Sequence, residues 1–166
     1  CYVYDVDAQT TRKMDVPMDE DGYMPRIAFT TDETKLAVMT LNRNQNRFEM
    51  YFVNPRSTVS KLILREEDKQ YIDSNLIQSI HFLPNQFVYL SERDGYSHIY
   101  VYGLTGALQK QLTSGNFDVT SLLAVDSKAG AVYYQAADEA LTRNIYKITI
   151  DRGVVSKLST HTGHNS

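Results

Sequence analysis

The chain has 166 residues, of which 42% are hydrophobic and 22% charged, a composition typical of one soluble globular domain. Its 17 basic and 20 acidic residues give a net charge of −3, which argues against a nucleic-acid-binding protein, since such proteins usually carry a basic face. The single cysteine excludes an internal disulfide and a cysteine-based zinc site, and no apolar run reaches the roughly 18 residues of a membrane-spanning helix.

Short strand-like segments follow one another along the chain, separated by turn residues. The first two are Tyr2–Val6 and Arg12–Val16. The chain starts at Cys1 rather than Met, directly in the first strand-like pattern, so we expect it to be cut from a longer protein. Three groups of four strands follow. They are Arg26–Thr30, Lys35–Leu41, Arg47–Val53 and Val59–Leu64; Ile77–Leu83, Gln86–Ser91, His98–Leu104 and Leu108–Thr113; and Val119–Val125, Ala131–Ala136, Asn144–Ile150 and Val154–Leu158. The acidic segment Arg65–Tyr71 reads either as a short helical turn or as a connection between groups.

The groups repeat. Tyr51, Tyr100 and Tyr146 occupy matching positions, and a leucine follows each of them in the fourth strand. Four strands in every 40–50 residues are typical of a β-propeller blade. The sequence therefore predicts an all-β fold, a partial β-propeller of about three four-stranded blades plus half of another. Residues 1–18 would end one blade, and residues 23–66, 76–113 and 119–160 would form the others. A self-contained β-sandwich with similar strand spacing is the alternative.

An incomplete propeller has a physical consequence. Propellers close with about four to eight blades, so this number of blades should form an arc. An arc leaves apolar blade faces and strand edges without neighbours, and we therefore expect the chain by itself to self-associate.

Asp94, Ser97 and His98 lie within five residues and together supply the groups of a hydrolase triad. Such a triad needs a serine on a strained turn and partners from distant parts of the chain, and the sequence has no G-x-S-x-G motif. We therefore assign these residues to a hairpin turn and the following strand, and we predict no catalytic residue in this chain.

The remaining polar candidates also favour structural roles. His161 and His164 lack a third ligand for zinc, and His81 in its strand pattern is expected to be a buried core histidine, so we predict no metal or cofactor. The run Asn42–Arg47 has the composition of a hairpin loop. Glu66–Asp68 could attract a cationic ligand but is more simply a solvated turn, and Glu92–Asp94 would pair charges around a turn.

Four segments, in this order and spacing, resemble the propeller of the dipeptidyl peptidase IV family, and the similarity spans roughly residues 20–160. They are Leu41–Asn46, Ser91–Tyr100, Leu112–Val119 and Asn144–Ile148. The scarcity of cysteine is more similar to bacterial members than to animal ones. The resemblance implies an eight-bladed propeller that precedes an α/β-hydrolase domain absent from this chain, in a serine exopeptidase that acts outside the cytoplasm: periplasmic, secreted or membrane-anchored.

In that family the whole protein removes N-terminal dipeptides, preferring Pro or Ala as the second residue, and the propeller shapes the cavity around the peptide substrate. Two adjacent glutamates bind its free amine. Glu66 and Glu67 lie at a blade junction, outside the position of that pair, and do not take its role. Some members carry an aromatic-basic pair that would align near Asn75 and Leu76, which are neither aromatic nor basic. The alternative is a non-catalytic propeller that serves as an interaction scaffold.

Overall fold

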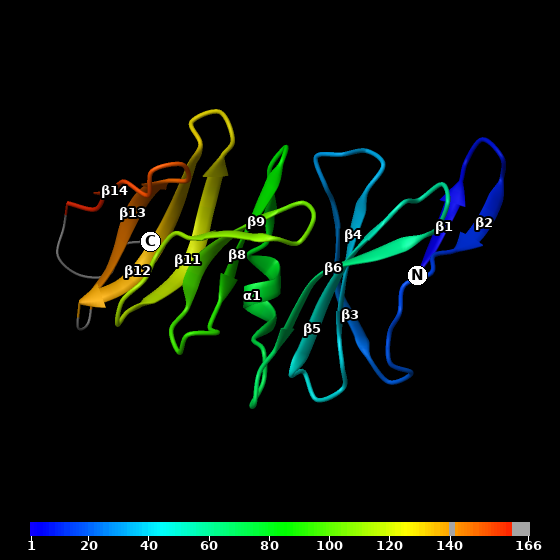
Figure 1. Ribbon diagram of the computed structural model, residues 1–166, viewed down its shortest axis with the longest axis horizontal. Coiled ribbons are helices and arrows are strands. Elements are labelled where there is room, and N and C mark those ends of the chain that lie inside the picture. The colour runs from blue at the N-terminus through cyan, green and yellow to red at the C-terminus, as the bar shows by residue number, and fades with distance from the viewer. Residues whose placement is uncertain (140–141, 161–166) are drawn as a thin grey trace. The chain divides into compact units, whose positions relative to one another are not determined.

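The structure is a computed structural model and describes residues 1–139 and 142–160 (Figure 1). The described residues contain fourteen strands and one short helix, joined by turns and loops. The elements are β1 (Tyr2–Asp5), β2 (Thr10–Lys13), β3 (Tyr23–Phe29), β4 (Leu36–Leu41), β5 (Arg47–Val53), β6 (Ser60–Glu67), α1 (Ser74–Gln78), β7 (His81–Phe82), β8 (Gln86–Ser91), β9 (His98–Gly103), β10 (Leu108–Gln111), β11 (Asp118–Asp126), β12 (Ala131–Glu139), β13 (Thr142–Thr149) and β14 (Val155–Lys157). The predicted all-β class is confirmed.

Every sheet is an antiparallel meander of consecutive strands. Strands β1 and β2 form a two-stranded sheet, and the three four-stranded sheets contain β3–β6, β7–β10 and β11–β14. A sandwich would exchange strands between sheets through Greek-key connections, and none of the described sheets does so. The chain divides into two compact units, residues 1–78 and 79–166.

The first unit packs the two-stranded sheet on one face of the sheet β3–β6. Met14, Val38, Tyr51 and Val53 form a buried cluster, against which Cys1, Val3, Val16, Met24 and Leu36 pack. The backbone N–H of Asp15 also donates to the carbonyl of Thr58 at 3.0 Å. Apolar burial and this hydrogen bond together hold the half blade on its neighbour.

The connection between β6 and β7 differs from the prediction. The segment Ile77–Leu83 was expected to be one strand, but its start belongs to α1 and only His81 and Phe82 pair with β8. The helix buries Leu76 and Ile77, and the Arg26 Nη1 donates to the carbonyls of Ile77 and Gln78 at 3.0 Å each. Because these carbonyls lie at the helix C-terminus, the guanidinium satisfies groups that have no partner within the helix.

The segment Arg65–Tyr71 is neither a helical turn nor, over its whole length, a connection between blades. Arg65–Glu67 continue β6, where Arg65 pairs with Glu49 in register, and only the residues after Glu67 connect the sheets. Glu49 is buried, and a buried carboxylate needs a charge partner. Arg65 supplies that partner when Arg65–Glu67 pair with β5 as a strand.

The three blades share one polar contact between their third and fourth strands. Two residues before the repeated tyrosines stand Glu49, His98 and Asn144, and all three are buried. Arg65 Nε donates to Glu49 Oε1 at 2.7 Å, the His98 Nδ1 lies 3.2 Å from Thr113 Oγ1, and Ser159 Oγ donates to Asn144 Oδ1 at 3.0 Å. We call these contacts the closing pairs of the blades.

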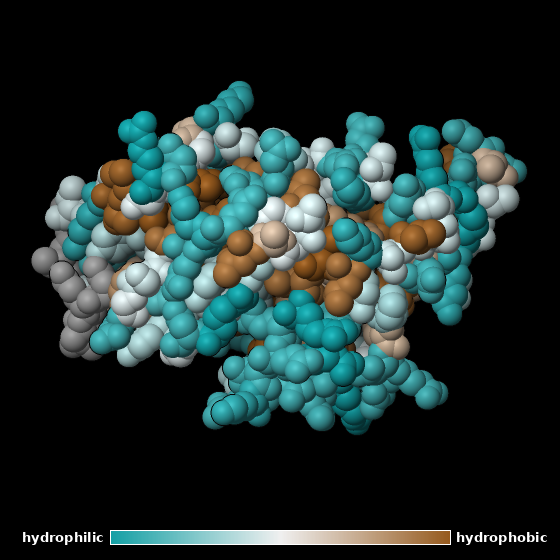
Figure 2. Space-filling model, in the orientation of Figure 1, coloured by the Kyte–Doolittle hydropathy of each residue, from teal (hydrophilic) through white to brown (hydrophobic). Residues whose placement is uncertain are grey.

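Several large apolar side chains remain exposed at strand edges. Phe29 in β3 is 89% exposed, and Tyr2 and Tyr4 in β1 and Val154 and Val155 around the start of β14 are also exposed. Figure 2 shows hydrophobic surface, in brown, in the region of β13 and β14. No helix in the described part of the chain is long and apolar enough to span a membrane.

Candidate functional site

Asp94, Ser97 and His98 have separate partners in the structure. The buried His98 ring uses both nitrogens: Nε2 donates to the carbonyl of Gly115 at 3.1 Å, which leaves Nδ1 to accept from the Thr113 hydroxyl. The Ser97 N–H donates to Asp118 Oδ1 at 2.8 Å, and the Gln111 side chain donates to Asp94 Oδ2 at 2.7 Å. These contacts fix the β8–β9 hairpin against the start of β11.

The Asp94 carboxyl is held in its ionised form. Burial acts to raise its pKa, but hydrogen bonds from the Gln111 side chain and the Tyr96 backbone outweigh burial and lower the pKa. A carboxylate with a lowered pKa is a poor general base at neutral pH, because catalysis of proton transfer is most efficient when the pKa lies near the working pH. The contacts of Asp94 are therefore those of a turn residue.

The polar run Asn42–Arg47 is a hairpin loop that satisfies its own groups. Asn42 Oδ1 accepts from the N–H groups of Asn46 and Arg47, each at 3.0 Å, and Arg47 Nη2 pairs with Asp19 Oδ2 at 2.7 Å. With Glu67 and Asp68 these residues line a small polar cavity of about 230 Å³.

The other candidates lie apart from one another in the chain. Glu66 and Glu67 are in β6, and Arg93 places its guanidinium 4.5 Å from the centre of the Tyr100 ring. On α1, Asn75 is exposed whereas Leu76 is buried and packs inward.

His81 is half-buried rather than fully buried, and its Nδ1 lies 2.8 Å from the carbonyl of Ser79. His161 and His164 lie outside the described residues. Within the described part of the chain, no group of three or more His, Cys, Asp or Glu side chains is placed to hold a metal ion.

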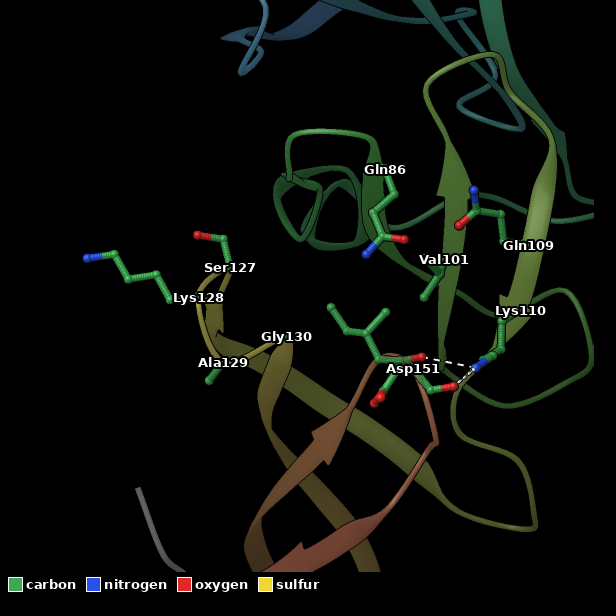
Figure 3. Close-up of a pocket in the computed structure, with 10 residues that line it drawn as sticks. Gln86, Val101, Gln109, Lys110, Ser127, Lys128, Ala129, Gly130 and Asp151 are labelled. Atoms are coloured by element: carbon green, nitrogen blue, oxygen red, sulfur yellow. Dashed lines mark hydrogen bonds between the residues drawn. The ribbon is translucent and has the colours of Figure 1, made fainter.

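A cleft lies within the second unit, between the sheets β7–β10 and β11–β14 (Figure 3). Its volume is about 520 Å³, within the usual range for small-molecule sites. The lining residues are Gln86, Val101, Gln109, Lys110, Ser127, Lys128, Ala129, Gly130, Ile150 and Asp151. We call this feature the inter-blade cleft.

One side chain ties the two walls of the inter-blade cleft together. Lys110 Nζ, from β10, donates to the carbonyl of Ile150 at 3.0 Å and to the carbonyl of Asp151 at 2.5 Å. Val101 and Ile150 are buried and provide an apolar floor. The cleft thus combines a fixed ammonium group with apolar surface and amide side chains.

No pattern in the sequence indicates this cleft. Gln86, Gln109 and Lys110 are ordinary residues near hairpin turns, and Ser127–Gly130 form such a turn themselves. They come together only because neighbouring blades pack side by side, so the pattern of any one strand could not reveal them.

Comparison with known proteins places the whole chain in one family. The family model described as dipeptidyl peptidase IV (DPP IV) N-terminal region matches residues 1–166. The crystal structure of Porphyromonas gingivalis dipeptidyl peptidase 4 superposes with a TM-score of 0.94 and 47% identity, covering 99% of this chain and 24% of that chain. This similarity confirms the predicted partial propeller.

Curated relatives of this chain are also dipeptidyl peptidases. The dipeptidyl peptidase 4 of Arthroderma otae is 31% identical over 147 residues, which cover 84% of this chain and 19% of that protein. The dipeptidyl peptidase 4 of Trichophyton rubrum is 29% identical over 129 residues, which cover 74% of this chain and 16% of that protein. This chain therefore spans less than a fifth of these relatives and belongs, over its whole length, to the family of dipeptidyl peptidase IV N-terminal regions.

Proposed function

We propose that this chain is the propeller segment of a dipeptidyl peptidase IV-like serine exopeptidase that removes N-terminal dipeptides with Pro or Ala in the second position. The observation that carries the proposal is the match of residues 1–166 to the family's N-terminal region, supported by the superposition on the P. gingivalis peptidase. The names of the curated relatives agree with this activity.

In this proposal the chain contributes shape and stability, and the chemistry resides in the rest of the protein. The relatives are several times longer than this chain, which leaves room for a separate catalytic domain. That domain would cleave the peptide by acyl transfer through a serine that a histidine activates. The closing pairs and the packed blade faces would keep the wall of the substrate cavity rigid.

The test is an assay of the intact protein with chromogenic Gly-Pro and Ala-Pro substrates. We expect cleavage of both, and no cleavage of the same substrates after N-acetylation, because an exopeptidase of this kind needs the free amine. If the intact protein cleaves none of them, the segment belongs to a non-catalytic propeller that serves as an interaction scaffold, and the proposal is wrong.

The same resemblance leads us to propose that the intact protein works outside the cytoplasm, as a periplasmic, secreted or membrane-anchored protein. Recovery of the intact protein only in the cytoplasmic fraction of its source cells would contradict this.

A further inference from the structure

We propose that the inter-blade cleft of the second unit binds a carboxylate that carries an apolar side chain, such as the C-terminal residue of a short peptide. This site is separate from peptide hydrolysis: its ligand is recognised by the carboxylate end, whereas the proposed substrate is recognised by its free amine. Three features of the cleft support the proposal, namely a fixed cation, a neutral hydrogen-bond donor and an apolar floor.

The cation is Lys110. Two carbonyl oxygens, those of Ile150 and Asp151, hold its Nζ in place at 3.0 and 2.5 Å. An ammonium group has three N–H donors, so one remains for a ligand. Among the side chains described, those of residues 1–137 and 142–160, no ion pair of 4.0 Å or less involves Lys110. A carboxylate ligand would supply the missing counter-charge to an ammonium that is already ordered.

One neutral donor faces the same space. Figure 3 shows the Gln86 amide directed into the cleft, across from the wall that carries Lys110. Hydrogen bonds from such a group to a carboxylate are charge-assisted and roughly twice as strong as neutral ones.

The charges around the cleft favour an anion. Lys110 and Lys128 are cationic, and Asp151 is the acidic residue of the lining. Asp151 Oδ2 lies 3.6 Å from the Arg152 Nε, and both side chains are exposed to solvent, which screens the Asp151 charge. In Figure 3 the Lys128 side chain extends outward from the turn, away from the other lining residues, so Lys110 is the cation that faces the cleft.

The apolar part of the ligand has a place beside the carboxylate. Val101 and Ile150 form the buried floor, and a neighbouring cavity of about 250 Å³ shares Gln86 and Ile150 with the cleft. This second cavity adds Leu83 and Pro84 to the lining. A ligand whose carboxylate meets Lys110 can therefore lay a branched aliphatic side chain on this surface, which favours a residue such as valine.

The test uses the intact protein and two probes, N-acetyl-alanyl-valine and its C-terminal amide, in isothermal titration calorimetry. Both probes lack a free amine and are therefore not substrates of the proposed peptidase, so the result does not depend on that activity. We expect the acid to bind about tenfold more tightly than the amide, because only the acid forms charge-assisted bonds. N-acetyl-valine, tested alongside, distinguishes a single carboxylic acid from a peptide C-terminus.

Three variants locate the binding. Lys110→Gln should abolish the preference for the acid, whereas Lys157→Gln removes an equal charge from an exposed position in β14 and should keep it. Because Lys110 also ties two blades together, Gln86→Leu serves as a second variant; it should weaken binding of the acid by about tenfold without changing the unfolding temperature. Equal binding of acid and amide, no binding of either, or unchanged binding by both cleft variants would overturn the proposal.

Discussion

At the scale of single residues, Gly22 shows how tightly the backbone turns before β3. A Cβ atom added there would lie 3.0 Å from the carbonyl oxygen of Leu41 and 3.1 Å from that of Asp19. Both neighbours are backbone atoms in a turn that the hydrogen bond from the Gly22 N–H to the Asp19 carbonyl closes at 3.0 Å. Neither can move as a flexible side chain would, so a side chain at this position would force the backbone of the turn to shift by a few tenths of an ångström.

We therefore expect Gly22→Ala to lower the free energy of unfolding by about 1–3 kcal/mol, the usual cost of overpacking. Urea unfolding of the two proteins measures this difference. Gly153→Asn is the matched control: Gly153 has φ +67° and no atom within 4 Å of an added Cβ, and asparagine tolerates this backbone region. Equal stability of Gly22→Ala and the parent protein would show that the turn can shift.

Asp32 illustrates a surface turn that depends on charge. Its Oδ1 accepts hydrogen bonds from the N–H and hydroxyl of Thr34 at 2.9 and 2.7 Å, and Lys35 Nζ lies 2.5 Å from Oδ2. The hydrogen bond from Lys35 and those from Thr34 lower the pKa of the Asp32 carboxyl well below its usual range. A lowered pKa in the folded state means that the ionised carboxylate stabilises the fold.

This stabilisation should be fully present above the unfolded-state pKa of about 3.9 and should decrease as the pH falls toward the lower folded-state value. We expect Asp32→Asn to reduce stability slightly at pH 7 and to have a smaller effect at pH 3. Urea unfolding at both pH values, with Asp7→Asn in the exposed turn between β1 and β2 as the control, measures the difference. A difference that grows at low pH would contradict the assignment.

At the scale of elements, the closing pairs occupy the same place in each blade. In the two blades of the second unit, the Leu-Thr and Leu-Ser pairs that follow β10 and β14 place a hydroxyl against the start of the third strand. Thr113 Oγ1 accepts from the Ile99 N–H at 2.9 Å, and Ser159 Oγ accepts from the Ile145 N–H at 3.3 Å. The hydroxyl thus satisfies a backbone donor and a buried polar side chain together.

The blade β3–β6 meets the same requirement with charges. Arg65 Nη2 lies 2.5 Å from Glu49 Oε1, and the Tyr51 hydroxyl donates to Glu49 Oε2 at 3.1 Å. Burial and the hydrogen bond to Glu49 raise the pKa of Tyr51, and the bond to Glu49 raises the pKa of Arg65. Different residue types therefore perform one structural task at equivalent positions.

Replacing Thr113 tests this account. Thr113→Val keeps the shape but removes the hydroxyl, which leaves His98 Nδ1 and the Ile99 N–H without their partner, so we expect a loss of about 1–3 kcal/mol. Thr113→Ser should cost less than half as much, since serine performs this task at position 159. Thermal and urea unfolding provide the comparison, and equal stability of the two variants would show that the hydroxyl contributes nothing.

At the scale of the whole molecule, each blade needs neighbours on both of its faces. A twisted four-stranded sheet has two faces to cover, and blades stack to cover them. The exposed Phe29, Tyr2, Tyr4 and Val155 lie on strands that end a sheet. These edges and side chains are places where another strand or apolar surface can bind.

We therefore propose that the 166-residue chain, produced by itself, self-associates through these edges. Light scattering after size-exclusion chromatography should give a mass above 19.0 kDa that rises with concentration. Replacing Phe29 by Lys should reduce the association, whereas Glu33→Gln, which changes the net charge equally at an exposed position in the turn after the same strand, should leave it unchanged. A monodisperse monomer at high concentration would contradict this proposal.

The sequence by itself determined the class of fold, the number of blades and the family, because a blade is a local unit. Its strands are consecutive, its turns are short, and its repeated tyrosines are read along one segment of chain. The sequence also predicted correctly that His98 begins a strand, because Asp94-Gly95 marks the turn before that strand. The short helix α1 was not predicted, because five residues are too few to show a helical period and its hydrogen bonds to Arg26 join positions about 50 residues apart.

Only the tertiary structure decided where blades touch. The inter-blade cleft draws on positions 86, 101, 109–110, 127–130 and 150–151, which five separate turns and strands contribute. Lys110 donates to two backbone carbonyls. Every residue has a backbone carbonyl, so the residue types at these positions do not indicate the contact. Contacts made by the backbone across packed sheets carry no sequence signal, and for that reason the candidate binding site appeared only when the blades were assembled.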